Sequence, residues 1–134
     1  MNEKELNRIP PQSIEAEQSL LGALLIDKRA FDKMADITEP DDFYKDSHRY
    51  IYEGMLTLYS KQEPIDILTV SNILEERKQI EIIGGRSYLA SLSQLVPTSS
   101  HVVQYAHIIK KKATLRRLQN VSSEISDLAG QEDE

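Results

Sequence analysis

Hydrophobic residues recur at helical spacing along most of the chain, and short polar breaks separate one run from the next. These runs predict a first helix from about Ile14 to Ile26, a short helix carrying Phe31, Met34 and Ile37, a helix capped by Asp46, a helix capped by Asp66, and a helix over residues 86–96 that Pro97 stops. Residues 80–83 form the only candidate strand, and they are too few to build a sheet. The pattern therefore predicts an all-α fold with a compact head of several helices.

The first predicted helix is unusually apolar. Its hydrophobic residues wrap well beyond one stripe and are Ile14, Leu20, Leu21, Ala23, Leu24, Leu25 and Ile26. Such a helix is either central in its own core or covered on a second side by a partner. Ser13 is the expected N-cap, and Pro10 and Pro11 predict a stiff, extended entry to the helix.

The last predicted helix is much longer than the others. It begins at Ser99 or Ser100, runs from about His101 to Leu128, and would be roughly 40 Å long. The head cannot cover a helix of that length, so part of it should project. The far half carries apolar residues three and four positions apart, Leu115, Leu118, Val121, Ile125 and Leu128, which we call the distal stripe. This stripe has no obvious partner within the chain and needs another helix.

The chain is thus expected to divide into four parts. Residues 1–12 are predicted to be a flexible arm, residues 13–97 a helical head, residues 98–130 the long helix, and residues 131–134 an acidic tail. The total length of 134 residues allows one compact domain.

Composition excludes several classes of function. The formal net charge of −6 disfavours unspecific binding to nucleic acid, and the lack of tryptophan argues against a base-stacking platform. The chain contains no cysteine and begins with no secretory signal, and its longest apolar run is too short to span a bilayer. We therefore expect a cytoplasmic protein that does not contact a membrane.

Candidate chemistry is sparse. The Gly-Gly-Arg-Ser sequence at residues 84–87 echoes the end of a phosphate loop, but it lacks the required lysine and the earlier glycine. The three histidines do not have the spacing of metal ligands, and Asp41 and Asp42 are interpreted as turn formers. No nucleophile, base and oxyanion site come together. The chain by itself is predicted not to be an enzyme, with no catalytic residue, cofactor or metal.

Two features leave alternatives open. The basic residues Lys110, Lys111, Lys112, Arg116 and Arg117 scatter around the long helix. They could be solvated, or they could contact an acidic partner or nucleic acid. Residues 66–92 contain two helices joined by a glycine-containing connection, so a helix-turn-helix DNA-binding regulatory domain is an alternative. The connection of about eight residues is longer than that motif expects.

Five blocks of the sequence resemble one protein family. They are "RIPPQSIEAEQSLLGALLID", "DDFYKDSHRYIYEGM", "EPIDILTVSNIL", "IGGRSYLASL" and "VPTSSHVVQYAHIIKKKATLRRL". In their order and spacing they resemble the N-terminal domain of the bacterial or phage replicative DNA helicases of the DnaB family. The resemblance covers about Arg8 to Leu128.

The resemblance implies an architecture and a set of partners. It implies a helical head followed by a helical hairpin, of which the long helix is the first half. In that family six copies form a collar, usually a trimer of dimers, on a ring of motor domains that use ATP and Mg²⁺ and move along single-stranded DNA. The collar recruits primase through the primase's C-terminal helicase-binding domain. We therefore expect this chain to be a fragment, a non-catalytic scaffold for subunit assembly and primase docking.

Candidate contact residues follow from this interpretation. The distal stripe from Leu115 to Leu128 is predicted to meet the second hairpin helix and primase, because buried apolar anchors carry most interface energy. Glu15 and Tyr88, each near the start of a helix, are weaker candidates. Ordinary core packing remains the simpler interpretation of the leucines in the first helix.

Overall fold

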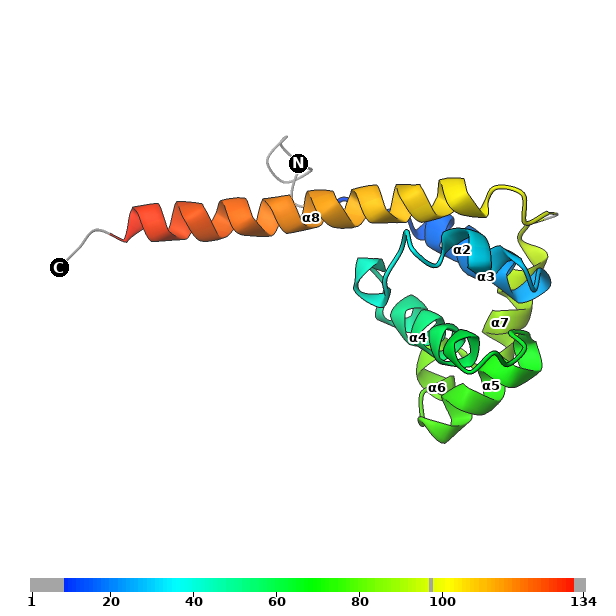
Figure 1. The fold of residues 1–134 in the computed structure, drawn as a ribbon. Coiled ribbons are helices and arrows are strands. Elements are labelled where there is room, and N and C mark those ends of the chain that lie inside the picture. The colour runs from blue at the N-terminus through cyan, green and yellow to red at the C-terminus, as the bar shows by residue number, and fades with distance from the viewer. Residues whose placement is uncertain (1–8, 97, 132–134) are drawn as a thin grey trace.

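The computed structural model describes residues 9–96 and 98–131, and all regular structure in those ranges is helical (Figure 1). The elements in chain order are α2 (Ile14–Ile26), α3 (Ala30–Met34), the 3₁₀ turn η1 (Pro40–Asp42), α4 (Asp46–Ser60), α5 (Ile67–Glu76), α6 (Ile80–Ile83), α7 (Gly85–Gln94) and α8 (Val102–Gly130). The all-α prediction is confirmed. Most of the predicted arm and of the acidic tail, and Pro97 as a helix stop, lie outside the described residues.

Helix α2 is the centre of the head. Ser13 caps it as predicted, accepting a hydrogen bond from the Ala16 N–H. The helix packs against α7 on one side and α8 on another, and it also touches α4. Leu20, Leu21 and Leu24 are at most 1 % exposed. The helix is apolar on several sides because its own chain surrounds it, so no second subunit is needed to explain the leucines.

Helices α2 and α7 come unusually close at Gly22. A Cβ atom built on this glycine would lie 2.1 Å from the backbone oxygen of Leu92 in α7. Only hydrogen fits at that point, since a real Cβ cannot approach backbone so closely. Gly22 therefore fixes the distance between the central helix and α7.

Aromatic side chains fill the space between α3, η1 and α4. The ring of Tyr52 stacks on Phe31 and lies 4.9 Å from Phe43, centroid to centroid, and Tyr59 also stacks on Phe31, with ring centroids 4.6 Å apart. Tyr52 also donates a hydrogen bond to the Thr38 carbonyl at 2.7 Å. Burial, together with Asp42 and Glu39, raises the pKa of the Tyr52 phenol, so the hydroxyl stays a donor.

Two local predictions are wrong in detail. Lys45, not Asp46, is the N-cap residue of α4, and Asp46 is the first helical residue. Ile37 lies beyond the end of α3 and packs on the core from the following loop. Residues 80–83, dismissed as a strand on their length, are a helical turn, α6, which ends at Gly84 with a φ of 105°. By contrast, Asp66 caps α5 as predicted, accepting from the Thr69 N–H.

Helix α8 starts on the head and leaves it. Its buried residues are Val102, Ala106, Ile109 and Ala113, which lie against α2, α3 and η1. After Ala113 no residue of α8 is buried, and the helix continues away from the head to Gly130 (Figure 1). The prediction that part of this helix projects is confirmed.

Candidate functional site

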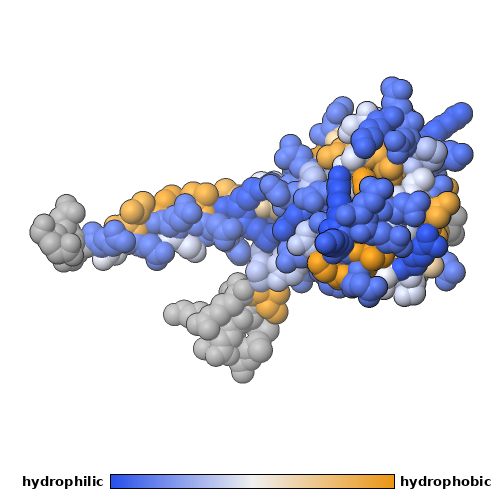
Figure 2. Space-filling model, turned by 90° about the horizontal axis from the view of Figure 1, so that it is seen from below, coloured by the Kyte–Doolittle hydropathy of each residue, from blue (hydrophilic) through white to orange (hydrophobic). Residues whose placement is uncertain are grey.

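The projecting part of α8 carries a regular, exposed apolar surface. Figure 2 shows a row of hydrophobic residues along one side of this helix. The exposed fractions are 37 % for Leu115, 58 % for Leu118, 50 % for Val121, 61 % for Ile125 and 67 % for Leu128. The head buries none of the stripe, because α8 has already separated from it. All five candidate residues of the distal stripe thus lie together on one accessible face.

The start of the stripe borders the segment that enters α2. A groove of about 780 Å³ runs between Pro10 and Pro11 on one side and Leu115 and Leu118 on the other. Its floor also includes polar side chains of α8, among them Gln119 and Ser122. The two prolines therefore extend the apolar surface of the stripe at its head end.

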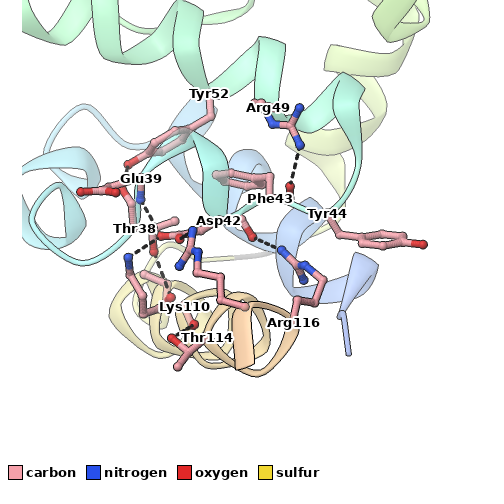
Figure 3. A network of polar contacts seen from close by, with 12 residues as sticks. Thr38, Glu39, Asp42, Phe43, Tyr44, Arg49, Tyr52, Lys110, Thr114 and Arg116 are labelled. Atoms are coloured by element: carbon pink, nitrogen blue, oxygen red, sulfur yellow. Dashed lines mark hydrogen bonds and ion pairs between the residues drawn. The ribbon is translucent and has the colours of Figure 1, made fainter. Parts of the chain in front are cut away.

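Three of the basic residues of α8 form polar contacts with the segments beside it. Lys110 Nζ lies 2.7 Å from one carboxylate oxygen of Asp42, and Arg117 Nη2 lies 2.6 Å from the other. Arg116 donates to the backbone oxygen of Asp42 (Figure 3). It also donates to the backbone oxygen of Pro11. Its guanidinium also lies 5.4 Å from the centroid of the Tyr44 ring, which supports a cation–π contact. These three residues hold α8 on the head, so the simple interpretation of the run as solvated is wrong for them.

Asp42 is a buried anchor as well as a turn residue. It is 0 % exposed and also accepts a hydrogen bond from the Glu39 N–H at 2.8 Å. Burial raises the pKa of its carboxyl, but the Glu39 N–H, Lys110 and Arg117 outweigh that effect and hold the pKa below its ordinary value. Asp42 is therefore a carboxylate at neutral pH. Its interpretation as a plain turn former missed this role, because its partners on α8 are far away in sequence.

A second buried polar cluster joins α2, α4 and α7. His48 Nδ1 lies 2.8 Å from Glu17 Oε1, and its Nε2 lies 2.5 Å from the Tyr88 hydroxyl. The other Glu17 oxygen accepts from the Tyr44 N–H at 2.7 Å. Glu17 and His48 are 1 % and 0 % exposed. Sequence reasoning missed this cluster, since it tested His48 only for metal-ligand spacing.

The two weaker contact candidates, Tyr88 and Glu15, differ in how accessible they are to a partner. The Tyr88 ring is partly buried and stacks on His48, and its hydroxyl is held by His48 and Gln18. Only part of this side chain is thus accessible to a partner. Glu15 is exposed in the first turn of α2 and lies on the solvent side of the helix that carries Glu17.

Comparison with known proteins decides the family. A family model described as the DnaB-like helicase N terminal domain matches residues 9–111. The chain belongs to this family. It is 44 % identical over 126 residues to the replicative DNA helicase DnaB of Geobacillus stearothermophilus and 41 % identical over 120 residues to the replicative DNA helicase DnaC of Bacillus subtilis. These matches cover 94 % and 90 % of the chain but 28 % and 26 % of the relatives' lengths.

A solved structure gives the same assignment. The fold matches the crystal structure of the N-terminal domain of DnaB helicase from Mycobacterium tuberculosis with a TM-score of 0.89 and 38 % sequence identity. The match covers 93 % of this chain and 87 % of the other. The DnaB-family fold therefore extends over nearly all of the chain, and the recognition of this family from its sequence blocks is confirmed.

The helix-turn-helix alternative is not favoured by these findings. In the chain, α6 lies between α5 and α7, where that motif has only a tight turn. Within residues 9–96 and 98–131, no cluster of three or more His, Asp or Glu side chains could hold a metal ion. No helix in the same ranges is long and apolar enough to cross a bilayer.

Proposed function

We propose that this chain is the N-terminal collar domain of a replicative DNA helicase that unwinds duplex DNA at the replication fork. Its role is to bring subunits together and to dock primase, without catalysing a reaction itself. The observation that carries the proposal is the distal stripe, an apolar face on a helix that extends beyond its own head. Membership in the DnaB-like N-terminal family makes helicase assembly the natural context for such a face.

The energetics of the stripe favour a partner. Its five residues are each more than a third exposed. Burying a Leu or Ile side chain of this kind contributes about 1.5 to 3 kcal/mol, so a helix that covered the stripe would gain several kcal/mol before the cost of association. We propose that this partner is the second helix of a hairpin and, on the outer side, the helicase-binding domain of primase.

The parent protein would supply the activities that this chain lacks. The chain spans about a quarter of the length of the relatives named above. We propose that the remainder holds a motor domain using ATP and Mg²⁺, that six copies assemble as a trimer of dimers, and that single-stranded DNA passes through the ring. Two copies of the chain alone could pair. The site of action would be the cytoplasm, where bacterial DNA replicates.

Light scattering after gel filtration tests the docking role. The chain is run alone and mixed with the helicase-binding domain of the cognate primase, and the mass of each peak is measured. We expect a co-eluting complex of defined mass. Ile125→Asp should weaken that complex at least tenfold while leaving the melting temperature nearly unchanged, because the side chain is 61 % exposed and touches no core residue.

Ser126→Asp is the matched control, since it adds the same charge at the next position of α8 but off the stripe. It should bind like the unaltered chain. If no complex forms, the measurement is repeated with the chain extended through the second hairpin helix. Continued absence of binding would rule out primase as the partner.

A further inference from the structure

The junction between the head and α8 is built differently from the rest of the core. The apolar contacts of α8 with the head end at Ala113, and two of the four buried residues are alanines. Small apolar contacts have little directional preference, so they alone allow the helix to slide or roll on the surface beneath it. Directional contacts are concentrated at residues 110–117, where α8 leaves the head.

One buried side chain provides two of these directional contacts. Lys110 and Arg117 are two turns apart on α8, and they approach opposite oxygens of the Asp42 carboxylate at 2.7 and 2.6 Å. A carboxylate held from both sides along the helix axis resists movement in either direction. Sliding α8 by one turn, about 5 Å, would break both ion pairs and leave a fully buried negative charge with only the Glu39 N–H as its partner.

Further hydrogen bonds join α8 to η1 and to the chain segments next to it. Arg116 donates to the Asp42 carbonyl at 2.7 Å and to the Pro11 carbonyl at 2.8 Å, so it ties η1 and the entry to α2 to one position on α8. Thr38, just before η1, donates to the Ala106 carbonyl at 2.9 Å. Figure 3 shows Lys110 and Arg116 reaching from α8 to the η1 segment that contains Asp42.

We propose that Asp42, clamped between Lys110 and Arg117, locks the axial register and the direction of α8 relative to the head. We call these three residues the Asp42 clamp. The clamp is a positioning device: it determines where the projecting helix points and hence where the distal stripe is presented. It does not depend on the proposed function, because it concerns two parts of one chain and requires no partner.

Distance measurements between paired spin labels test the clamp. The chain has no cysteine, so two introduced cysteines can be labelled without background. We would label exposed Glu76 in α5 and exposed Glu124 in α8, then compare the unaltered clamp with the double variant Lys110→Gln, Arg117→Gln. An intact clamp should give one narrow distance. The variant should widen the distribution at least twofold or shift its centre by about 5 Å, one helical turn.

Three controls isolate the direction of α8. The double variant Lys111→Gln, Lys112→Gln removes the same charge from the same helix, and neither lysine forms an ion pair within the described residues. It should keep the narrow distance. A label pair at Lys33 and Glu76 reports on the head alone, and a pair at Gln104 and Glu124 reports on the straightness of α8.

The outcomes separate cleanly. The clamp is supported if the Lys110, Arg117 variant broadens the distance distribution of the Glu76–Glu124 label pair and leaves those of the Lys33–Glu76 and Gln104–Glu124 pairs unchanged. An unchanged distribution in the Lys110, Arg117 variant would show that apolar packing alone aims α8, and the proposal fails. Broadening of the internal pairs as well would assign these residues to the stability of the whole fold, which also overturns a specific role in positioning.

Discussion

Replacing Gly22 with alanine tests the closest approach in the head. The added methyl group would lie 2.1 Å from the Leu92 oxygen and 3.0 Å from the Leu92 carbonyl carbon. Both atoms belong to the backbone of α7, so no side chain can rotate out of the way. Restoring ordinary van der Waals contact requires α2 and α7 to separate by about 1 Å, and a gap of that size loses a quarter to a half of the dispersion energy across the interface.

The net effect combines two opposing contributions. Alanine is favoured over glycine inside a helix by about 1 kcal/mol. Overpacking a core usually costs about 1 to 3 kcal/mol and sometimes more, and here the contact is with rigid backbone at the centre of the fold. Taking the upper end of that cost, we expect Gly22→Ala to lower the free energy of unfolding by about 2 kcal/mol, and the melting temperature by about 7 °C.

Two other helical glycines provide matched controls. At Gly54 a Cβ would meet only side-chain atoms, with Ile73 Cγ2 nearest at 3.2 Å, so Gly54→Ala should change stability by less than about 1 kcal/mol. At Gly130 nothing lies within 4 Å, and Gly130→Ala should be neutral or slightly stabilising. Urea unfolding of all three variants can be followed by circular dichroism at about 222 nm, where α-helices give a strong negative band. Equal stability of the Gly22 and Gly54 variants would refute the reasoning about α7.

Other residues give further testable expectations. Glu17→Ala should cost about 3 kcal/mol in urea unfolding, because it leaves the buried His48 and the partly buried Tyr44 N–H without their acceptor. Glu15→Gln, on the exposed side of α2, should stay within about 0.5 kcal/mol. The pKa of Asp42 is lower in the folded chain than its ordinary value of 3.8, so its contribution is complete above that pH and is lost as the pH falls further. The gap in melting temperature between the unaltered chain and Asp42→Asn should therefore shrink below about pH 4, and a gap that stays constant down to about pH 2 would contradict this assignment.

The local sequence pattern was sufficient for most of the helices. Ser13 and Asp66 cap helices by accepting from N–H groups three residues onward, a contact set by short-range geometry alone. The length of the last helix and the spacing of the distal stripe likewise follow from residues close together in sequence. The five family-like blocks were also readable directly, and the domain match agrees with them.

Tertiary structure decided the roles of the polar residues. Nothing in the neighbourhood of Asp42 indicates that its partners lie 68 and 75 residues later, and the pairing Glu17–His48–Tyr88 spans three helices. Burial makes these contacts strong, and burial exists only after the helices pack. Packing also explains why α2 and the distal stripe end up in different environments. Both are apolar in sequence, but in the folded chain α2 is covered and the distal stripe stays exposed. Local pattern sets which surfaces are apolar, while packing sets which of them remain available.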